Sequence, residues 1–231
     1  MKKLRIALLD VTEMSGDAVC IAGMDMASGA TLRLADRTPT RRLLRSYGGF
    51  RPTDIITVQY EPKRRTEPPH TEDGRWDHLT LRKDGTIDPT VLTRLLTPKA
   101  FNSVEEAFGA PAFKGRNGNS AWLPGQGLRS LATVRASAIR AHLAGDALRV
   151  KFTDAGGGHW PAAPFQDLAV KTHPQTCASC AAGFLRNVAG EFDADDVLVR
   201  VGLTRPFSAG DTPPGCWLQV TNVLNGARSH F

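Results

Sequence analysis

The sequence predicts a mainly β protein made of two tandem units, and three observations support this prediction. Short apolar runs alternate with turns that contain Gly, Ser or Asp, which is typical of antiparallel strands. This pattern pauses in a loop-rich stretch and starts again around residues 125–127. The length of 231 residues accommodates two units of roughly 100 residues each. We therefore expect one domain at residues 1–115 and a second at residues 116–231.

The first unit is expected to contain five strands and three short helical segments. The strands are predicted at residues 4–11, 18–26, 30–34, 54–60 and, with a weaker pattern, 77–82. Residues 41–46 predict a short helix or a loop. Asp88 as an N-cap followed by Pro89 predicts a helix up to Leu96. Ser103, with a glutamate three residues later, forms a capping box and predicts a helix up to Phe108.

The second unit is also expected to contain five strands, together with one helix. Its strands are predicted at residues 136–143, 148–152, 165–170, 197–203 and 215–224. Residues 176–188 are rich in Ala and space their larger apolar side chains along one helical face. Five strands with short inserted helices in about 100 residues match the size of an OB-like β-barrel, so two tandem OB-like barrels are the expected fold. SH3-like barrels, or one larger barrel, are alternatives on the same pattern.

Composition points to a soluble protein of the cytoplasm. No run approaches the roughly 20 apolar residues that a membrane helix needs, and the N-terminus lacks the pattern of a secretory signal. The chain has four cysteines, and Cys20 and Cys216 lie in strand-like apolar runs, as buried thiols do. We therefore expect a reducing compartment, no disulfides and no membrane partner.

The basic charge of the chain is concentrated in one segment. The net charge is +6, and residues 33–65 contain nine basic and three acidic residues, so this segment carries the whole excess. A concentrated positive charge favours an acidic partner, most often nucleic acid. Most of these residues are arginines, whose forked donors suit phosphate. The alternative is that they are solvated loop residues or pair with acids from the other half.

Several short motifs resemble a known family. Residues 20–25 (CIAGMD), followed by Leu32–Arg33, resemble a strand pair with a Cys-x-Ala-Gly core and a terminal arginine. Residues 68–76 (PPHTEDGRW) resemble a His-x-Glu stretch, and residues 199–207 (VRVGLTRPF) with 216–223 (CWLQVTNV) resemble a C-terminal strand pair. Together these motifs are similar to the dual OB-containing domain family of bacterial, often defence-associated, proteins. Leu32 and Ala35 depart from the family pattern, in which an aromatic residue and a proline are usual.

The resemblance implies tandem OB barrels, nucleic-acid binding and no catalysis, and no cofactor is expected. The sequence itself contains neither a phosphate-cradling loop nor a nucleophile-elbow motif. We therefore expect a non-enzymatic protein that binds single-stranded DNA or RNA with little sequence specificity, in a prokaryotic defence system. One alternative is a subunit of a defence complex that binds an acidic protein partner or a small nucleotide. Another is a metal-dependent nuclease.

An OB groove follows the backbone of a single strand with basic side chains and stacks bases on aromatic rings. The predicted nucleic-acid-binding residues are Arg33, Arg37, Arg41, Arg42, Arg45, Tyr47, Phe50, Arg51, Lys63, Arg64, Arg65, Trp76 and Arg205. Core packing is the alternative for the aromatic residues of this set. His70 and Glu72 either form an acid–base pair or fix the loop between two strands through hydrogen bonds.

A metal site is a further open alternative. His173, Cys177 and Cys180 have the spacing H-x-x-x-C-x-x-C, which supplies three ligands for Zn²⁺ but needs a fourth, such as Cys216. The same spacing permits a redox pair, and it also permits two small residues packed inside a helix. The acidic residues at 191–196 suit Mg²⁺ in a nuclease, or an exposed turn before a strand.

Overall fold

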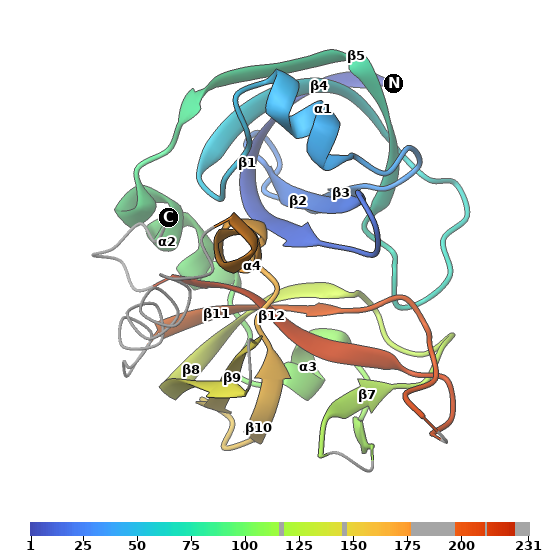
Figure 1. Cartoon of the computed structure of the whole chain (residues 1–231), viewed down its shortest axis with the longest axis vertical. Helices are drawn as coiled ribbons and strands as arrows, with labels where there is room; N and C mark the ends of the chain where they lie inside the picture. Colours follow the sequence, from blue (N-terminus) through green and yellow to red (C-terminus); the bar gives the residue numbers. More distant parts are fainter. Residues whose placement is uncertain (116–117, 145–146, 177–196, 211, 225–231) are drawn as a thin grey trace.

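The alternating apolar residues of the first half close into a five-stranded barrel in the computed structural model (Figure 1). The structure describes residues 1–115, 118–144, 147–176, 197–210 and 212–224. The barrel strands are β1 (Lys2–Glu13), β2 (Val19–Asp25), β3 (Thr31–Leu34), β4 (Asp54–Pro62) and β5 (Asp73–Thr86). They are ordered β1-β2-β3-β5-β4, with β1 paired to β4. The parallel pairing of Arg33 in β3 with Asp73 in β5 completes the barrel.

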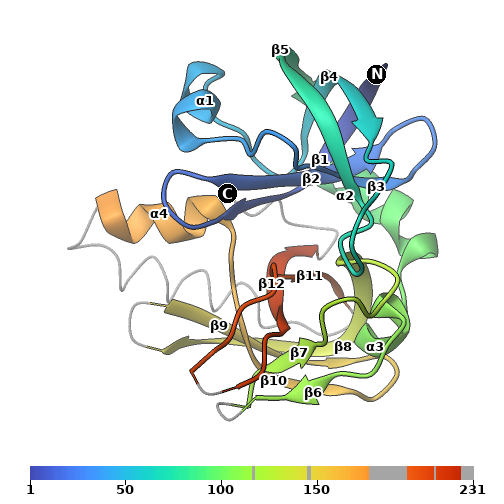
Figure 2. The same ribbon diagram turned by 90° about the vertical axis from the view of Figure 1, so that its right-hand side faces the viewer.

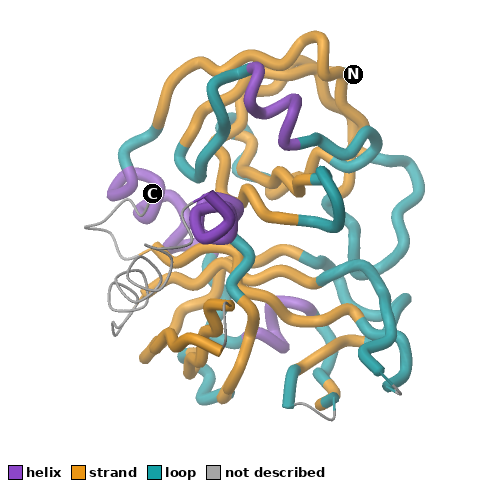
Figure 3. The backbone as a smooth tube through the Cα atoms, in the orientation of Figure 1, coloured by secondary structure: helices purple, strands orange, loops and turns teal. Residues whose placement is uncertain are grey.

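Helices form at the two segments predicted to be helical and also at residues 41–46, for which a helix or a loop was predicted (Figure 3). Each of the three begins at a side-chain cap. They are α1 (Arg41–Ser46), α2 (Pro89–Leu96), which continues into the 3-10 helix η1 (Thr97–Lys99), and α3 (Val104–Phe108). Thr40 caps α1, and Asp88 caps α2 with Pro89 at its first position. Ser103 accepts a hydrogen bond from the backbone N–H of Glu106 at 3.1 Å, as the capping box predicts.

The second half forms a curled sheet of seven strands, ordered β10-β9-β8-β11-β12-β7-β6 (Figure 2). Its strands are β6 (Phe113–Lys114), β7 (Ser120–Trp122), β8 (Leu131–Ala144), β9 (Ala147–Asp154), β10 (His159–Pro164), β11 (Val197–Leu203) and β12 (Cys216–Leu224). Its concave side packs a core around Trp122 and Phe108, whose rings meet edge to face at 4.9 Å. α3 belongs to this core, although it precedes the boundary expected after residue 115.

The two halves share a buried interface. A third apolar cluster joins Ala7, Leu9 and Met24 of the barrel to Leu198 and Leu224 of the curled sheet. The helix α4 (Leu168–Thr176) lies beside β1, as both perpendicular views show (Figures 1 and 2). Both apolar and polar contacts cross this interface, so the two halves pack directly against each other.

The strand content confirms the prediction of a mainly β chain and of a barrel in the first half, with two local corrections. Residues 165–170 were expected to be a strand, but Asp167 accepts a hydrogen bond from the N–H of Val170 and caps α4. The short strands β6 and β7, and β10 with its two prolines, were not expected, so the second unit has seven strands instead of five. Residues 177–188 of the expected Ala-rich helix lie outside the described residues. Within the described part, no helix combines the length and apolarity that crossing a membrane requires.

Candidate functional site

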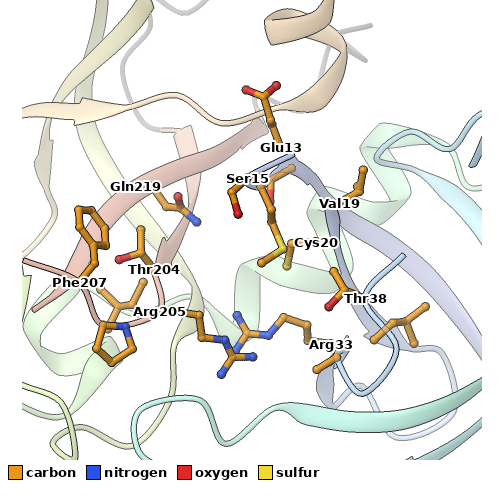
Figure 4. A pocket seen from close by; sticks show the side chains of 16 residues that line it. Glu13, Ser15, Val19, Cys20, Arg33, Thr38, Thr204, Arg205, Phe207 and Gln219 are labelled. Carbon is orange, nitrogen blue, oxygen red and sulfur yellow. The ribbon is translucent and has the colours of Figure 1, made fainter. Parts of the chain in front are cut away.

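A pocket of about 370 Å³ opens between the barrel and the curled sheet (Figure 4). We call it the seam pocket. Its barrel wall consists of residues 12–15 at the β1–β2 turn, residues 19–20 of β2, and residues 33–35 and 38 of β3 and the loop after it. Its other wall consists of residues 203–207 after β11 and Gln219 of β12. The volume falls within the range of about 300–1,000 Å³ that is usual for small-molecule sites.

Two arginines from opposite walls meet on one carboxylate beside this pocket. Arg33 donates from Nε to Oδ1 of Asp73 at 2.7 Å, and Arg205 donates from an Nη to Oδ2 at 2.6 Å. Figure 4 shows the two guanidinium groups side by side. Burial acts to raise the pKa of Asp73, but the two arginines outweigh it and lower the pKa, so the carboxylate is ionised at neutral pH. The two arginines therefore share Asp73, and the nearby carboxylate of Glu72 also acts on Arg33.

Arg33 is held in place by the loop between β4 and β5. One Nη of Arg33 donates to Nδ1 of His70 at 3.0 Å and to Oγ of Ser130 at 2.8 Å. An arginine only donates, so Nδ1 of His70 accepts and its proton lies on Nε2. Glu72 accepts hydrogen bonds from the N–H groups of Ser130 and Leu131 at 2.7 and 2.8 Å. These contacts bear out the expectation that His70 and Glu72 fix the loop.

Local sequence features explain this loop. Tyr60 donates a hydrogen bond to the carbonyl of Glu72 at 3.1 Å, and its ring lies directly on Gly74. A Cβ at Gly74 would lie 2.0 Å from Cζ of Tyr60, so glycine is the residue that permits this contact. On the facing wall, Thr204 exchanges hydrogen bonds with the backbone of Trp217, which fixes the segment that carries Arg205.

Burial and the charges of Arg33 and Arg205 lower the pKa of His70 to about 3. In the unfolded chain this histidine takes up a proton near its ordinary pKa of 6.5, whereas in the folded protein it stays neutral down to about pH 3. Acid therefore favours the unfolded state through this group. We expect the urea midpoint to fall between pH 6.5 and 4, and we expect His70→Gln to fall less steeply. Parallel slopes for both proteins would contradict this assignment.

Asp167 affects the same measurement with the opposite sign. Burial raises its pKa to about 6, so its carboxyl is protonated in the folded protein at a pH where the unfolded chain has lost that proton. Its contribution to stability is therefore largest at low pH and is lost as the pH rises through 6. Comparing His70→Gln with wild type in an Asp167→Asn background separates the two effects.

The acidic end of the seam pocket is neutralised within the protein. Glu13 forms ion pairs with Arg41 and with Lys171 of α4, the latter at 3.2 Å. Burial acts to raise the pKa of Glu13, but Lys171 and Arg41 outweigh it and lower the pKa. Burial raises the pKa of the Cys20 thiol, so this half-buried residue contributes a neutral wall. Of the two arginines that line the seam pocket, Arg205 is the one whose side chain is exposed.

The predicted basic residues divide into three groups. Arg33 is only 7 % exposed, so it belongs to the interface and not to an open groove. Arg41 and Lys63 form ion pairs with Glu13 and Asp36, and Arg205 forms one with Asp73 while its side chain stays 48 % exposed. The exposed members of the set are Arg37, Arg42, Arg45, Arg51, Arg64 and Arg65.

The predicted stacking residues lie inside the barrel. Phe50 and Trp76 are 6 % and 3 % exposed and belong to its core. Tyr47 stacks on Phe50 at 5.9 Å and is half-buried. The indole N–H of Trp76 donates to the carbonyl of Arg37, which shows what holds that ring in place. Phe50 and Trp76 therefore present no open ring face to a base, and core packing accounts for both.

The metal hypothesis concerns residues that are mostly outside the described structure. Cys177 and Cys180 are not among the described residues, and His173 is described only as a backbone position of α4. Across residues 1–115, 118–144, 147–172, 197–210 and 212–224, no group of three or more His, Cys, Asp or Glu side chains is arranged to hold a metal ion. Cys216 is buried and lies 4.0 Å from Nε2 of His70.

Phe207 and Asp73 belong to the candidate site but were not among the site residues predicted from the sequence. Phe207 lines the seam pocket with half of its surface exposed, and its ring lies 6.0 Å from that of Trp217. Its position after Thr204–Arg205–Pro206 was a usable signal, because a proline directly after a strand predicts a loop. Asp73 had no such signal, since its partners are distant in sequence.

Comparison with models of known protein families finds no match for this chain, and no curated protein sequence matches it significantly. The segments that bear the motifs described above meet at the seam pocket, because Cys20, Arg33 and Arg205 line it and His70 contacts Arg33.

Proposed function

We propose that this protein is a non-enzymatic binding protein for single-stranded nucleic acid, with the seam pocket at the centre of the binding surface. The observation that carries the proposal is the pair of guanidinium groups, Arg33 and Arg205, that share Asp73 in a cleft. Asp73 engages only one Nη of Arg205, and the side chain of Arg205 is 48 % exposed, so this guanidinium can still bind a phosphate. We also propose the role in a prokaryotic defence system that the family resemblance implies.

The barrel topology supports this proposal. A closed barrel with a short helix between β3 and β4 is consistent with an OB-like fold. OB-type barrels bind oligonucleotides on strands 2 and 3 and on the loops that follow strands 1 and 4. The seam pocket lies at one end of this face, where it is lined by residues 19–20 of β2, residues 33–34 of β3 and the β1–β2 turn, and the β4–β5 loop carries the exposed Arg64 and Arg65. We extend the OB-like assignment to the curled sheet as part of the same proposal.

Exposed basic residues near the pocket offer a path for the backbone of the strand. Arg37 precedes Thr38, which lines the pocket, and it is exposed. Lys63, Arg75 and Asp36 form a small ion-pair group next to it, with distances of 3.5 and 3.3 Å to the aspartate. Three cations lie near Asp36, and Glu61 lies opposite Arg75 in the β4–β5 ladder, so the cations still outnumber the acids and attract phosphate in a salt-dependent manner.

Fluorescence anisotropy with labelled single-stranded DNA, single-stranded RNA and duplex DNA tests the proposal at 50 and 200 mM salt. We expect the single strands to bind more tightly than the duplex. Arg205→Gln should weaken single-strand binding about tenfold, because it removes a charged hydrogen-bond donor. Arg64→Gln/Arg65→Gln should lower the slope of log K against log salt by about 0.7 for each phosphate that the variant no longer neutralises.

Arg94→Gln is the matched control, since Arg94 is exposed on α2 and does not line the seam pocket. It should bind like the wild type. The proposal is overturned if the wild-type protein binds no oligonucleotide at 50 mM salt. It is also overturned if Arg205→Gln and the double variant both bind with wild-type affinity and salt dependence.

A further inference from the structure

The outer face of β2 and β3 is occupied by the protein itself. On this face, Ala22, Met24 and Arg33 are 0 %, 4 % and 7 % exposed. Met24 packs against Leu198 and Leu224 of the curled sheet, and Arg33 donates to Ser130 just before β8. The second half therefore covers the surface along which an OB-type barrel carries an extended strand.

Space remains at the two ends of this covered face. The seam pocket lies at the end formed by Cys20 and Arg33, and a second cavity of about 440 Å³ lies at the end formed by Met24 and Thr31. Between these ends, Glu72 binds the backbone at the start of β8 and Arg33 binds Ser130. A strand cannot continue from one end to the other without breaking these contacts, so the seam pocket suits a short ligand.

The hydrogen-bond donors of the seam pocket that have no partner in the described residues indicate which chemical group the ligand contains. Arg205 uses one Nη for Asp73, and within the described residues its other donors have no protein partner. The side chains of Gln219 and Ser15 also line the pocket and make no hydrogen bond to the described part of the chain. Figure 4 shows the side chains of Gln219 and Ser15 facing the pocket from its two opposite walls. A guanidinium with nearby neutral donors is the usual surrounding of a bound phosphate.

The apolar part of the pocket lies beside these donors. Leu203 and Pro206 come from the same segment as Arg205, and Met14 and Val19 come from the barrel. Phe207 stands at the rim with one side towards Trp217 and half of its surface exposed. An exposed ring next to a phosphate-binding group can stack a base of any type.

We propose that the seam pocket binds one nucleotide bearing a phosphate monoester, with the phosphate on Arg205 and the base on Phe207. The nucleotide is either a free nucleoside monophosphate or the 5′-phosphorylated end of a single strand, because both present the same chemistry. This inference rests on the proposed function in taking the ligand to be nucleic acid or its monomer. It goes further because it limits the ligand of the pocket to one nucleotide, either free or at the 5′ end of a strand.

Isothermal titration calorimetry with AMP, adenosine and inorganic phosphate tests the ligand chemistry on the full chain. We expect AMP to bind at least tenfold more tightly than either adenosine or phosphate. Arg205→Gln should reduce AMP affinity about tenfold, and Phe207→Ala should reduce it about five- to a hundredfold through loss of stacking. Arg94→Gln should bind AMP like the wild type. Equal affinities for AMP and adenosine, or unchanged AMP binding in both pocket variants, would overturn the inference.

Labelled oligonucleotides with a 5′-phosphate or a 5′-hydroxyl distinguish the two sources. If strand ends are the natural ligand, the 5′-phosphate should tighten binding at least fivefold, and AMP should remove that advantage by competition. If free nucleotides are the ligand, AMP binds but the two oligonucleotides bind equally. If the protein does not bind AMP, and if neither the 5′-phosphate nor added AMP changes oligonucleotide binding, the inference is refuted and the proposed function stands. If the protein binds AMP but no oligonucleotide, the inference is supported and the proposed function is refuted.

Discussion

Asp10→Ala is expected to destabilise the protein by about 3–5 kcal/mol, because it leaves Arg200 buried without its counter-charge. The side chains of Asp10 and Arg200 are each only 1 % exposed, and they join the barrel to the curled sheet. Nε of Arg200 donates to Oδ1 of Asp10 at 3.2 Å, and a second nitrogen donates to Thr133 at 3.0 Å. Urea denaturation at pH 7, followed by tryptophan fluorescence, measures the loss.

Two controls separate the buried charge from other causes. Asp10→Leu/Arg200→Met removes both charges and should lose less stability than Asp10→Ala, since no unpaired ion is then left in the interface. Arg82→Ala breaks an exposed pair with Asp84, in which Arg82 is 67 % exposed, and should cost less than about 1 kcal/mol. A loss below about 1 kcal/mol for Asp10→Ala itself would show that water or another group compensates Arg200.

Asp73→Ala is expected to have the second large effect, on stability and on binding together. Arg33, at 8 % side-chain exposure, would keep His70 and Ser130 as hydrogen-bond partners and Glu72 as its nearby carboxylate, so a loss of up to about 3 kcal/mol is expected. Arg205 would lose the carboxylate that orients it. Asp73→Asn retains one acceptor oxygen and should lie between the wild type and Asp73→Ala.

The binding result distinguishes orientation from charge. Asp73→Ala makes the cleft more positive by one unit, so a purely electrostatic attraction would strengthen oligonucleotide binding. If Asp73 positions the two arginines, binding should weaken instead, because the guanidinium groups lose their common geometry. Anisotropy measured well below the melting temperature of the variant gives the answer. Tighter binding with unchanged stability would show that Asp73 has no positioning role.

The sequence by itself determined the local elements and the apolar faces of the barrel. Alternation predicted β4 and the strand segments of β1, β2 and β3, and side-chain signals placed the starts of α2 and α3, because these features depend on neighbouring residues alone. Where local signals conflicted, the prediction was wrong. Pro161 and Pro164 obscured β10, and Asp167 satisfied an alternating pattern while acting as a helix cap.

Only the tertiary structure decided which predicted residues meet. Alternation placed Leu32 and Leu34 on one face of β3 and Arg33 on the other, but it could not show what covers that other face. The curled sheet covers it, so Arg33 is a buried partner of Asp73 and Ser130. In our proposal, Arg205 and the exposed arginines contact the phosphates in place of Arg33. The physical reason is that contacts between distant segments depend on how two halves pack, and neither periodicity nor net charge records that packing.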